Sequence, residues 1–213
     1  TGSQQCLDFA GKLFLDPGDV VLCESPSYLG ALNAFNAYQP KFVEVPTDNG
    51  GLIPEELDKI LETTPNCKFI YVIPDFQNPT GRTWSMERRQ KFMEVVNKHN
   101  LPVLEDNPYG ELRYEGTILP SLKSMDTKGL VMFLGTFSKI FCPGLRLGWI
   151  AAEHSLLSEF VKIKQSADLH TSNFDQGVAD AYMEQYDLDE HVKEIVALYK
   201  HRRDLILESM EKY

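Results

Sequence analysis

The chain has 213 residues, of which 43% are apolar and 24% carry a charge, as in an ordinary globular protein of one or at most two domains. Its 21 lysines and arginines are outnumbered by 31 aspartates and glutamates, which gives a formal charge of −10 at pH 7. This balance argues against a nucleic-acid partner and against an anionic membrane surface. No apolar run approaches the ~20 residues needed to span a bilayer.

The four cysteines, Cys6, Cys23, Cys67 and Cys142, stand far apart and form no CxxC pair. Their spacing argues against a zinc knuckle and against a dense disulfide framework, so we expect no metal site. A chain with this cysteine usage is most simply placed in a reducing compartment, and we expect a cytoplasmic location.

Short apolar runs alternate with amphipathic stretches over most of the chain. The apolar spacing in residues 3–15 predicts a first helix, which the Asp-Pro-Gly-Asp sequence at 16–19 ends. Pro54 with two glutamates after it marks another helix start, because Pro fits the first turn and acids suit the positive end of the helix dipole. Ser85 caps a further helix. In chain order we expect helix 3–15, strand 19–24, helix 27–38, strand 41–46, helix 54–63, strand 67–74, helix 85–99, and strands 101–106, 130–135 and 146–152.

The C-terminal part changes character, with expected helices at 153–168, 174–186 and 188–212 and little strand between them. Alternation of strands and helices over the preceding part predicts an α/β fold, with a mainly parallel sheet flanked by helices. The chain opens without an initiator Met, and its last helix runs out to Tyr213 without a stop signal. We therefore expect a fold truncated at both ends.

Polar loops follow four of the expected strands. Their residues are Ser25–Tyr28, Asp75–Gly81, Asp106–Tyr109 and Thr136–Lys139. Ligands of a parallel sheet bind at the carboxyl ends of its strands, so we expect these four loops to converge on one rim.

The side chains in these loops suit one cofactor. Lys139 is flanked by Phe137, Ile140 and Phe141, and burial among them would disfavour the ammonium form and leave an amine able to form a Schiff base with a carbonyl. Asp106 can pair with a protonated ring nitrogen. A lysine Schiff base with an acid at the pyridinium nitrogen is typical of pyridoxal phosphate sites.

The remaining polar residues fit the other parts of that molecule. Asn78 and Tyr109 can donate to the phenolic oxygen of its ring, and Tyr28 can lie against the ring. The helix start at Gly2-Ser3-Gln4 offers free backbone N–H groups to a phosphate, and Arg146 adds a two-pronged donor to the same anion.

Each residue also has a simpler interpretation. Lys139 alone would be an exposed lysine, Arg146 a member of a surface ion pair, and Tyr28 part of the core. Asn78-Pro79-Thr80-Gly81 is a sequence that favours a turn in any context, and residues 2–4 could be frayed. The grouping of these residues at strand ends favours the cofactor roles.

The motifs GSQQ, ESPSY, PDFQNPTG, EDNPY and GTFSKIFCPGLRLGW resemble the class I/II pyridoxal-phosphate-dependent aminotransferases of fold type I, in that family's order and over the whole chain. QNPTGR, LHTSN and GSQQ are most similar to the branch that contains 2-aminoadipate, kynurenine and aromatic amino-acid aminotransferases. The same branch includes GntR-like transcriptional regulators with an aminotransferase-like domain.

The resemblance implies a role for each residue. Lys139 would carry pyridoxal 5'-phosphate and then move the substrate's α-proton, and Asp106 would pair with the ring nitrogen. Asn78 and Tyr109 would bond the phenolic oxygen, with Asn78 also reaching the substrate carboxylate. The phosphate would be held by Ser3, Gln4, Thr136, Ser138 and Arg146, with Tyr28 stacked on the ring.

The resemblance also implies a homodimer with active sites at the interface, in which residues 170–173 (HTSN) would reach towards the partner's cofactor. Residues 1–213 would be the cofactor-binding large domain, without the N-terminal segment and the C-terminal small domain of longer family members. Such a fragment is expected to be inactive by itself.

Three functions follow as hypotheses. The first is transamination between an α-amino acid, such as 2-aminoadipate or an aromatic amino acid, and a 2-oxo acid. The second is a sensor domain of a GntR-like regulator, which would need a winged-helix segment before Thr1. The third keeps the cofactor but catalyses another reaction, such as that of a β-lyase.

Overall fold

A computed structural model describes residues 1–212; Tyr213, to which the last expected helix extends, lies outside the described residues. Six strands form one sheet in the order β2-β1-β5-β6-β7-β8. Their bounds are β1 Val20–Glu24, β2 Lys41–Val45, β5 Cys67–Val72, β6 Val103–Asp106, β7 Val131–Thr136 and β8 Gly148–Ala151. All neighbours pair in parallel except β7 and β8. The predicted α/β fold with a mainly parallel sheet is confirmed.

Strand β8 runs antiparallel to β7 at the edge of the sheet, with Thr136 opposite Gly148. Only residues 137–147 join the two strands, and a parallel return needs a crossover of about a dozen or more residues, usually with a helix. The short connection therefore turns back beside the end of β7. The same short connection carries both Lys139 and Arg146.

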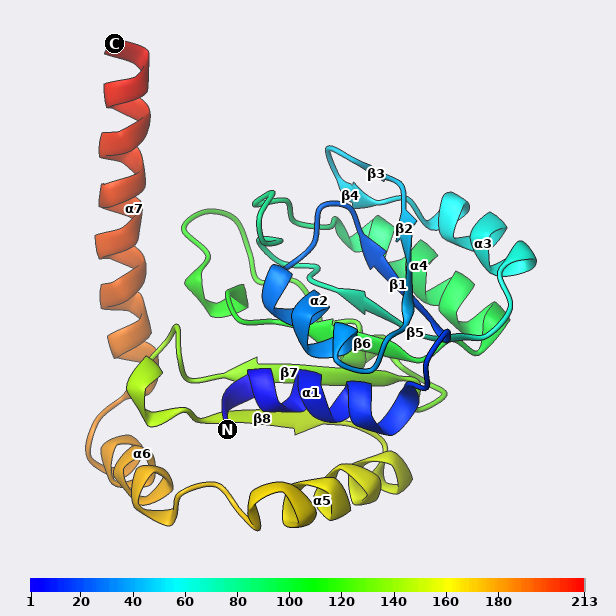
Figure 1. Ribbon diagram of the computed structural model, residues 1–213. Helices are drawn as coiled ribbons and strands as arrows, with labels where there is room; N and C mark the ends of the chain where they lie inside the picture. Colours follow the sequence, from blue (N-terminus) through cyan, green and yellow to red (C-terminus); the bar gives the residue numbers. More distant parts are fainter. Residues whose placement is uncertain (213) are drawn as a thin grey trace.

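Helices cover both faces of the sheet (Figure 1). On one face, α1 Gly2–Phe14, α2 Leu29–Asn36 and α5 His154–Asp168 bury Leu7, Phe35 and Phe160 in a common core. On the other face, α3 Pro54–Thr63 and α4 Met86–His99 bury Leu57 and Phe92. The parallel strands are apolar on both faces, as a sheet covered on both sides requires.

The helix ends follow their local sequence. The Ser85 hydroxyl accepts a hydrogen bond from the Arg88 backbone N–H and caps α4, and Asn100 closes that helix in the left-handed conformation. Two short strands, β3 Thr47–Asp48 and β4 Gly51–Leu52, form a hairpin that the sequence did not predict. Strands of two residues are too short to show an alternating pattern. Single 3₁₀ turns lie at η1 Gly110–Leu112, η2 Lys123–Met125 and η3 Pro143–Leu145.

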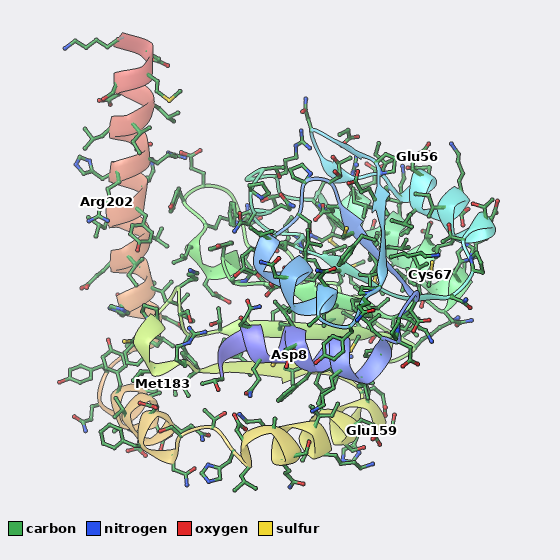
Figure 2. All side chains as sticks on the ribbon, in the orientation of Figure 1. Asp8, Glu56, Cys67, Glu159, Met183 and Arg202 are labelled. Carbon is green, nitrogen blue, oxygen red and sulfur yellow. The ribbon has the colours of Figure 1, made fainter. Side chains whose placement is uncertain are left out.

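The last two helices, α6 Asn173–Gln185 and α7 Leu188–Lys212, confirm the predicted change to helices. Helix α7 extends away from the sheet (Figure 1), and Figure 2 shows its side chains, among them Arg202, projecting into the open around it. None of the described α7 residues is buried, although Arg203 forms an ion pair with Glu115 at 2.8 Å. No helix within residues 1–212 has the length and apolar character needed to cross a membrane.

Candidate functional site

The ends of β6 and β7 and the loops around them form a pocket of about 270 Å³. Asp106 is the last residue of β6 and Thr136 the last of β7, and Lys139 follows three residues later. All ten predicted site residues line this pocket: Ser3, Gln4, Tyr28, Asn78, Asp106, Tyr109, Thr136, Ser138, Lys139 and Arg146. The structure thus brings together residues that are up to 143 positions apart (146 − 3).

One end of the pocket lies where the N-terminus of α1 meets Arg146. Helix α1 begins at Gly2, whose φ is +69°, and a Cβ there would lie 2.9 Å from Arg146 Nη2. A Cβ on Gly148 would lie 2.6 Å from the Ser3 backbone nitrogen, so the start of α1 sits directly against the start of β8. A helix N-terminus beside a guanidinium offers backbone donors and positive charge to a phosphate-sized anion.

The loop after β7 completes this anion site. Arg146 Nη1 donates hydrogen bonds to Ser138 Oγ at 3.3 Å and to the Pro143 carbonyl at 3.2 Å. The Ser138 backbone N–H donates to Thr136 Oγ1, whose hydroxyl donates to the Leu147 carbonyl. Two hydroxyl groups and the guanidinium are therefore held by one short network at the mouth of the pocket.

Asp106 is the buried acid of the site, with only 4% of its surface exposed. Its Oδ2 accepts a hydrogen bond from the Tyr71 hydroxyl at 2.8 Å, whereas Oδ1 is buried without a hydrogen-bond partner within residues 1–212. Burial raises the pKa of Asp106 to about 6, and the hydrogen bond from Tyr71 opposes this rise. A buried acceptor without a partner is rare in folded proteins. Because Asp106 lines the pocket, a molecule bound there can donate a hydrogen bond to this oxygen.

Lys139 is exposed rather than buried, so the expectation that its apolar neighbours would desolvate its amine is wrong. The reason is that β7 ends at Thr136 and the following turn carries Lys139 to the open side of the pocket. Its Nζ lies 5.9 Å from the centre of the Tyr109 ring. Burial raises the pKa of Tyr109, while a hydrogen bond with the Asn78 side chain opposes the rise.

Tyr28 satisfies both interpretations of its side chain, since it packs against the core beneath α1 and α2 and also lines the pocket. Its hydroxyl donates to Gln4 Oε1 at 3.4 Å, and Gln4 Nε2 donates to the Gly30 carbonyl at 2.8 Å. These bonds join the start of α1 to the start of α2, so the start of α1 is docked and the alternative of frayed residues 2–4 does not apply.

A buried ion pair holds the loop that carries Asn78. Asp75 Oδ1 accepts from Arg89 Nη2 at 2.8 Å and from Arg113 Nη2 at 2.9 Å, and Arg89 is fully buried. Gln77 Nε2 also donates to the Pro26 carbonyl at 2.8 Å, which ties the loops after β5 and β1 together. The Asn-Pro-Thr-Gly turn and the place of Asn78 in the pocket therefore exist together.

Sequence reasoning missed several residues of this site. Ile73, Pro108 and Pro143 also line the pocket, and Tyr71 holds Asp106 from behind. The signal for Tyr71 was its position among the apolar residues Phe69, Ile70 and Val72, because a buried tyrosine hydroxyl usually needs a hydrogen-bond partner.

Residues 170–173 lie elsewhere: residues 170–172 connect α5 to α6, and Asn173 begins α6. His170 and Thr171 line a second pocket of about 350 Å³ with Gly2, Trp149 and Lys164, on the side of α1 that faces α5 and β8. Their role towards a partner subunit stays a prediction. No cluster of three or more His, Cys, Asp or Glu side chains suited to a metal ion occurs within the described part of the chain.

The family model for aminotransferase class I and II matches residues 1–213. The chain is 44% identical to an aromatic-amino-acid aminotransferase of Thermococcus litoralis, covering 100% of this chain and 52% of that protein. It is also 32% identical over its whole length to two uncharacterised HTH-type transcriptional regulators of Bacillus subtilis, 44% of whose length it covers. The chain thus spans about half the length of the curated relatives it matches.

Solved structures show the same fold. The Pyrococcus horikoshii kynurenine aminotransferase, in complex with PMP and kynurenine, superposes with a TM-score of 0.95 at 42% identity, covering 100% of this chain and 54% of that one. The α-aminoadipate aminotransferase of Thermus thermophilus, complexed with N-(5'-phosphopyridoxyl)-L-leucine, gives 0.94 at 36% identity, covering 99% and 55%. On the family match over its full length, this chain belongs to the class I and II aminotransferases.

Proposed function

We propose that residues 1–213 form the pyridoxal 5'-phosphate-binding large domain of an aminotransferase, which moves an amino group between an α-amino acid and a 2-oxo acid. The observation that carries this proposal is the set of charges in one pocket. A buried carboxylate oxygen that lacks a partner within the described residues, an exposed amine and an anion site at a helix N-terminus all line it. The cofactor has a basic ring nitrogen, an aldehyde and a phosphate, which complement these three groups in turn.

The residues present fit the cofactor. The N-terminal turn of α1, through Ser3 and Gln4, would hold the phosphate together with Thr136, Ser138 and Arg146. Asp106 Oδ1 would accept from the ring N–H, and Asn78 and Tyr109 would donate to the phenolic oxygen, with Tyr28 against the ring. When bound, the cofactor supplies an electron sink for the bond broken at the substrate's α-carbon.

Lys139 is the catalytic residue of this proposal. Its Nζ is exposed on a loop between the anion site and Tyr109, where it can bind the aldehyde and, once displaced by substrate, move the α-proton. Asp106 holds the opposite charge at the ring nitrogen throughout. Asn78 orients the substrate carboxylate.

The substrate class is inferred from the relatives and from the neighbouring surface. The similar proteins are named for aromatic amino acids, kynurenine and α-aminoadipate. A second hollow, of about 710 Å³, shares Lys139 and Asn78 with the cofactor pocket and adds Phe76, Leu112, Tyr114 and Phe141. This apolar and aromatic lining supports a donor with a long or aromatic side chain.

Covalent trapping tests the proposal in the full-length protein. Incubation with pyridoxal 5'-phosphate should give a visible absorption band that sodium borohydride removes, with the cofactor then attached to the peptide that contains Lys139. Lys139→Ala should abolish both signals, whereas Lys59→Ala, at an exposed lysine paired with Glu56, should retain them. A borohydride-sensitive band that persists in Lys139→Ala would refute the assignment.

The assembly and activity of the whole protein are further proposals. We propose a homodimer in the cytoplasm, with residues 170–173 near the partner's site, and negligible turnover by residues 1–213 alone. Analytical ultracentrifugation of the full-length protein tests the dimer. Kynurenine and 2-aminoadipate test transamination through the 2-oxo acid that each would form. An aromatic donor, with an acceptor other than pyruvate, separates transamination from a β-lyase reaction, because transamination gives the donor's own 2-oxo acid whereas the lyase releases pyruvate, ammonia and the aromatic group.

A sensor domain of a transcriptional regulator is the second candidate, and the two Bacillus subtilis regulators favour it. Such a domain could keep every cofactor contact without turnover. A winged-helix sequence upstream of Thr1 in the intact gene would support the regulator over the enzyme.

A further inference from the structure

Tyr71 is the next-to-last residue of β5, and its side chain is fully buried. Its ring contacts Phe35 of α2 edge-on at 5.7 Å between ring centres. Tyr71 and Leu104 face the same core beneath α1 and α2, and Asp106 follows Leu104 by two residues on β6, on the same face of the sheet. Packing alone therefore fixes the position of the Tyr71 ring, independently of the hydrogen bond from its hydroxyl.

The hydroxyl of Tyr71 donates to Asp106 Oδ2 at 2.8 Å in a wholly buried contact. The other oxygen, Oδ1, lacks a partner among residues 1–212. A carboxylate could turn about its Cβ–Cγ bond, but here one oxygen is held from behind by a rigid donor. The other is therefore kept as the acceptor on the pocket side.

We propose that Tyr71 is a positioning residue, whose buried hydroxyl orients the Asp106 carboxylate and so presents Oδ1 to the ring nitrogen of the cofactor. This inference rests on the proposed function for the identity of the ligand. Without the phenol, Oδ2 would be a second buried acceptor without a donor, which disfavours the charged form of the acid.

A Tyr71 variant leaves the other titratable and charged groups around Asp106 in place. Cys6 of α1 and Tyr109 of the loop after β6 interact with the Asp106 charge, and Lys139 and Arg146 line the same pocket. Because Tyr71→Phe removes only one oxygen, a change in Asp106 reports on the missing hydrogen bond.

Tyr38→Phe is the matched control. The Tyr38 hydroxyl donates to Asp8 Oδ1 at 3.0 Å, and its ring packs against the same core as Tyr71. Asp8 lies on α1 (Figure 2) and is not among the pocket residues. Both variants therefore remove a tyrosine–aspartate hydrogen bond from one face of the sheet, but only Tyr71→Phe removes it from the site.

The first measurement uses the cofactor-free full-length protein. Carbon NMR of labelled aspartate side chains, with Asp106 assigned through Asp106→Asn, follows the titration of the carboxyl group. Tyr71→Phe should raise the Asp106 midpoint by about one pH unit or more, whereas Tyr38→Phe should leave it in place. An unmoved midpoint in Tyr71→Phe would overturn the inference.

The second measurement is the equilibrium dissociation constant for pyridoxal 5'-phosphate. Tyr71→Phe should weaken binding by about tenfold, because the lost hydrogen bond is to a charged group, and Tyr38→Phe by less than about twofold. In an Asp106→Asn background, Tyr71→Phe should add no further loss; an equal loss there would show a general structural effect and refute the positioning role. If the wild-type protein does not bind the cofactor, the proposed function fails, and the NMR titration still decides the role of Tyr71.

Discussion

Asp75 gives the sharpest test of how the candidate site is supported. Its side chain is buried, with Oδ1 between Arg89 at 2.8 Å and Arg113 at 2.9 Å. Asp75→Asn keeps the size of the side chain but removes the negative charge, which leaves the fully buried Arg89 guanidinium without its counterion. Loss of one partner from a buried ion pair typically costs about 3–5 kcal/mol.

The surroundings of Arg89 place the expected value at the lower end of that range. Its guanidinium also donates to the carbonyls of Trp84, Pro120 and Pro74, at 3.3, 3.0 and 3.4 Å, and these dipoles would continue to stabilise the charge in the variant. We therefore expect Asp75→Asn to lower the free energy of unfolding by about 3 kcal/mol. Asn78, three residues away, should move with the loosened loop.

Equilibrium urea unfolding measures this difference, with Asp48→Asn as the control. Asp48 pairs with Arg88 at the same 2.8 Å, but 47% of its side chain is exposed, so its removal should cost less than about 1 kcal/mol. The double variant Asp75→Asn/Arg89→Met should recover part of the loss, because it removes the uncompensated charge. Equal losses for Asp75→Asn and Asp48→Asn would refute the argument.

Three further predictions follow from the same structure. Burial raises the pKa of Glu24 from 4.5 to about 7, so the folded state binds this proton more tightly than the unfolded state does. The contribution of Glu24 to stability should therefore fall as pH rises between about 4.5 and 7, by up to about 3 kcal/mol. Urea unfolding of Glu24→Gln should show a flatter pH dependence than the wild type, and an unchanged slope would contradict this. Gly148→Ala should weaken cofactor binding by about tenfold or more, because the new Cβ would meet the backbone of α1. The control Gly177→Ala, whose Cβ would have nothing within 4 Å, should leave cofactor binding unchanged and stabilise α6 by about 1 kcal/mol. In equilibrium titrations, Arg146→Ala should weaken the binding of pyridoxal 5'-phosphate but not that of pyridoxal, which lacks the phosphate. Asp106→Asn should weaken the binding of both ligands. Equal effects of Arg146→Ala on the two ligands would refute the place of Arg146 at the phosphate.

The order of elements and the edge of the sheet that carries the pocket were predictable because both depend on local pattern. An apolar run followed by a polar loop identifies the carboxyl end of a buried strand, and a parallel sheet places all such ends on one side. Asp106 and Thr136 lie at strand ends for this reason. The pairing of Asp106 with a ring nitrogen was inferred from its place at a strand end together with Lys139 on a neighbouring loop, whereas the phosphate role of Thr136 came from the family resemblance.

What the sequence did not reveal depends on contacts between distant segments. Tyr71 and Asp106 are 35 positions apart and meet only because β5 and β6 are neighbours in the sheet. Arg89 was expected only as a residue of a helix, and its pairing with Asp75 requires α4 to pack beneath the loop after β5. Burial of Lys139 was wrongly predicted, because apolar neighbours in sequence need not surround a side chain on a turn.

The pocket also concentrates features that a protein selected for stability alone would avoid. Asp106 keeps a buried oxygen without a partner in the described residues, and its burial disfavours the carboxylate. Arg146 has a φ of +55°, in the left-handed region that a non-glycine residue rarely adopts, and its guanidinium lies beside the positive end of α1. The partnerless oxygen of Asp106 and the positive charge gathered at the start of α1 are both unfavourable for stability, and a ligand with a cationic ring nitrogen and an anionic phosphate would compensate both. The left-handed backbone of Arg146 adds a strain that such a ligand does not relieve. Since conflicts between local stability and fold cluster at functional sites, these features of Asp106 and Arg146 support the proposal that the pocket binds such a ligand.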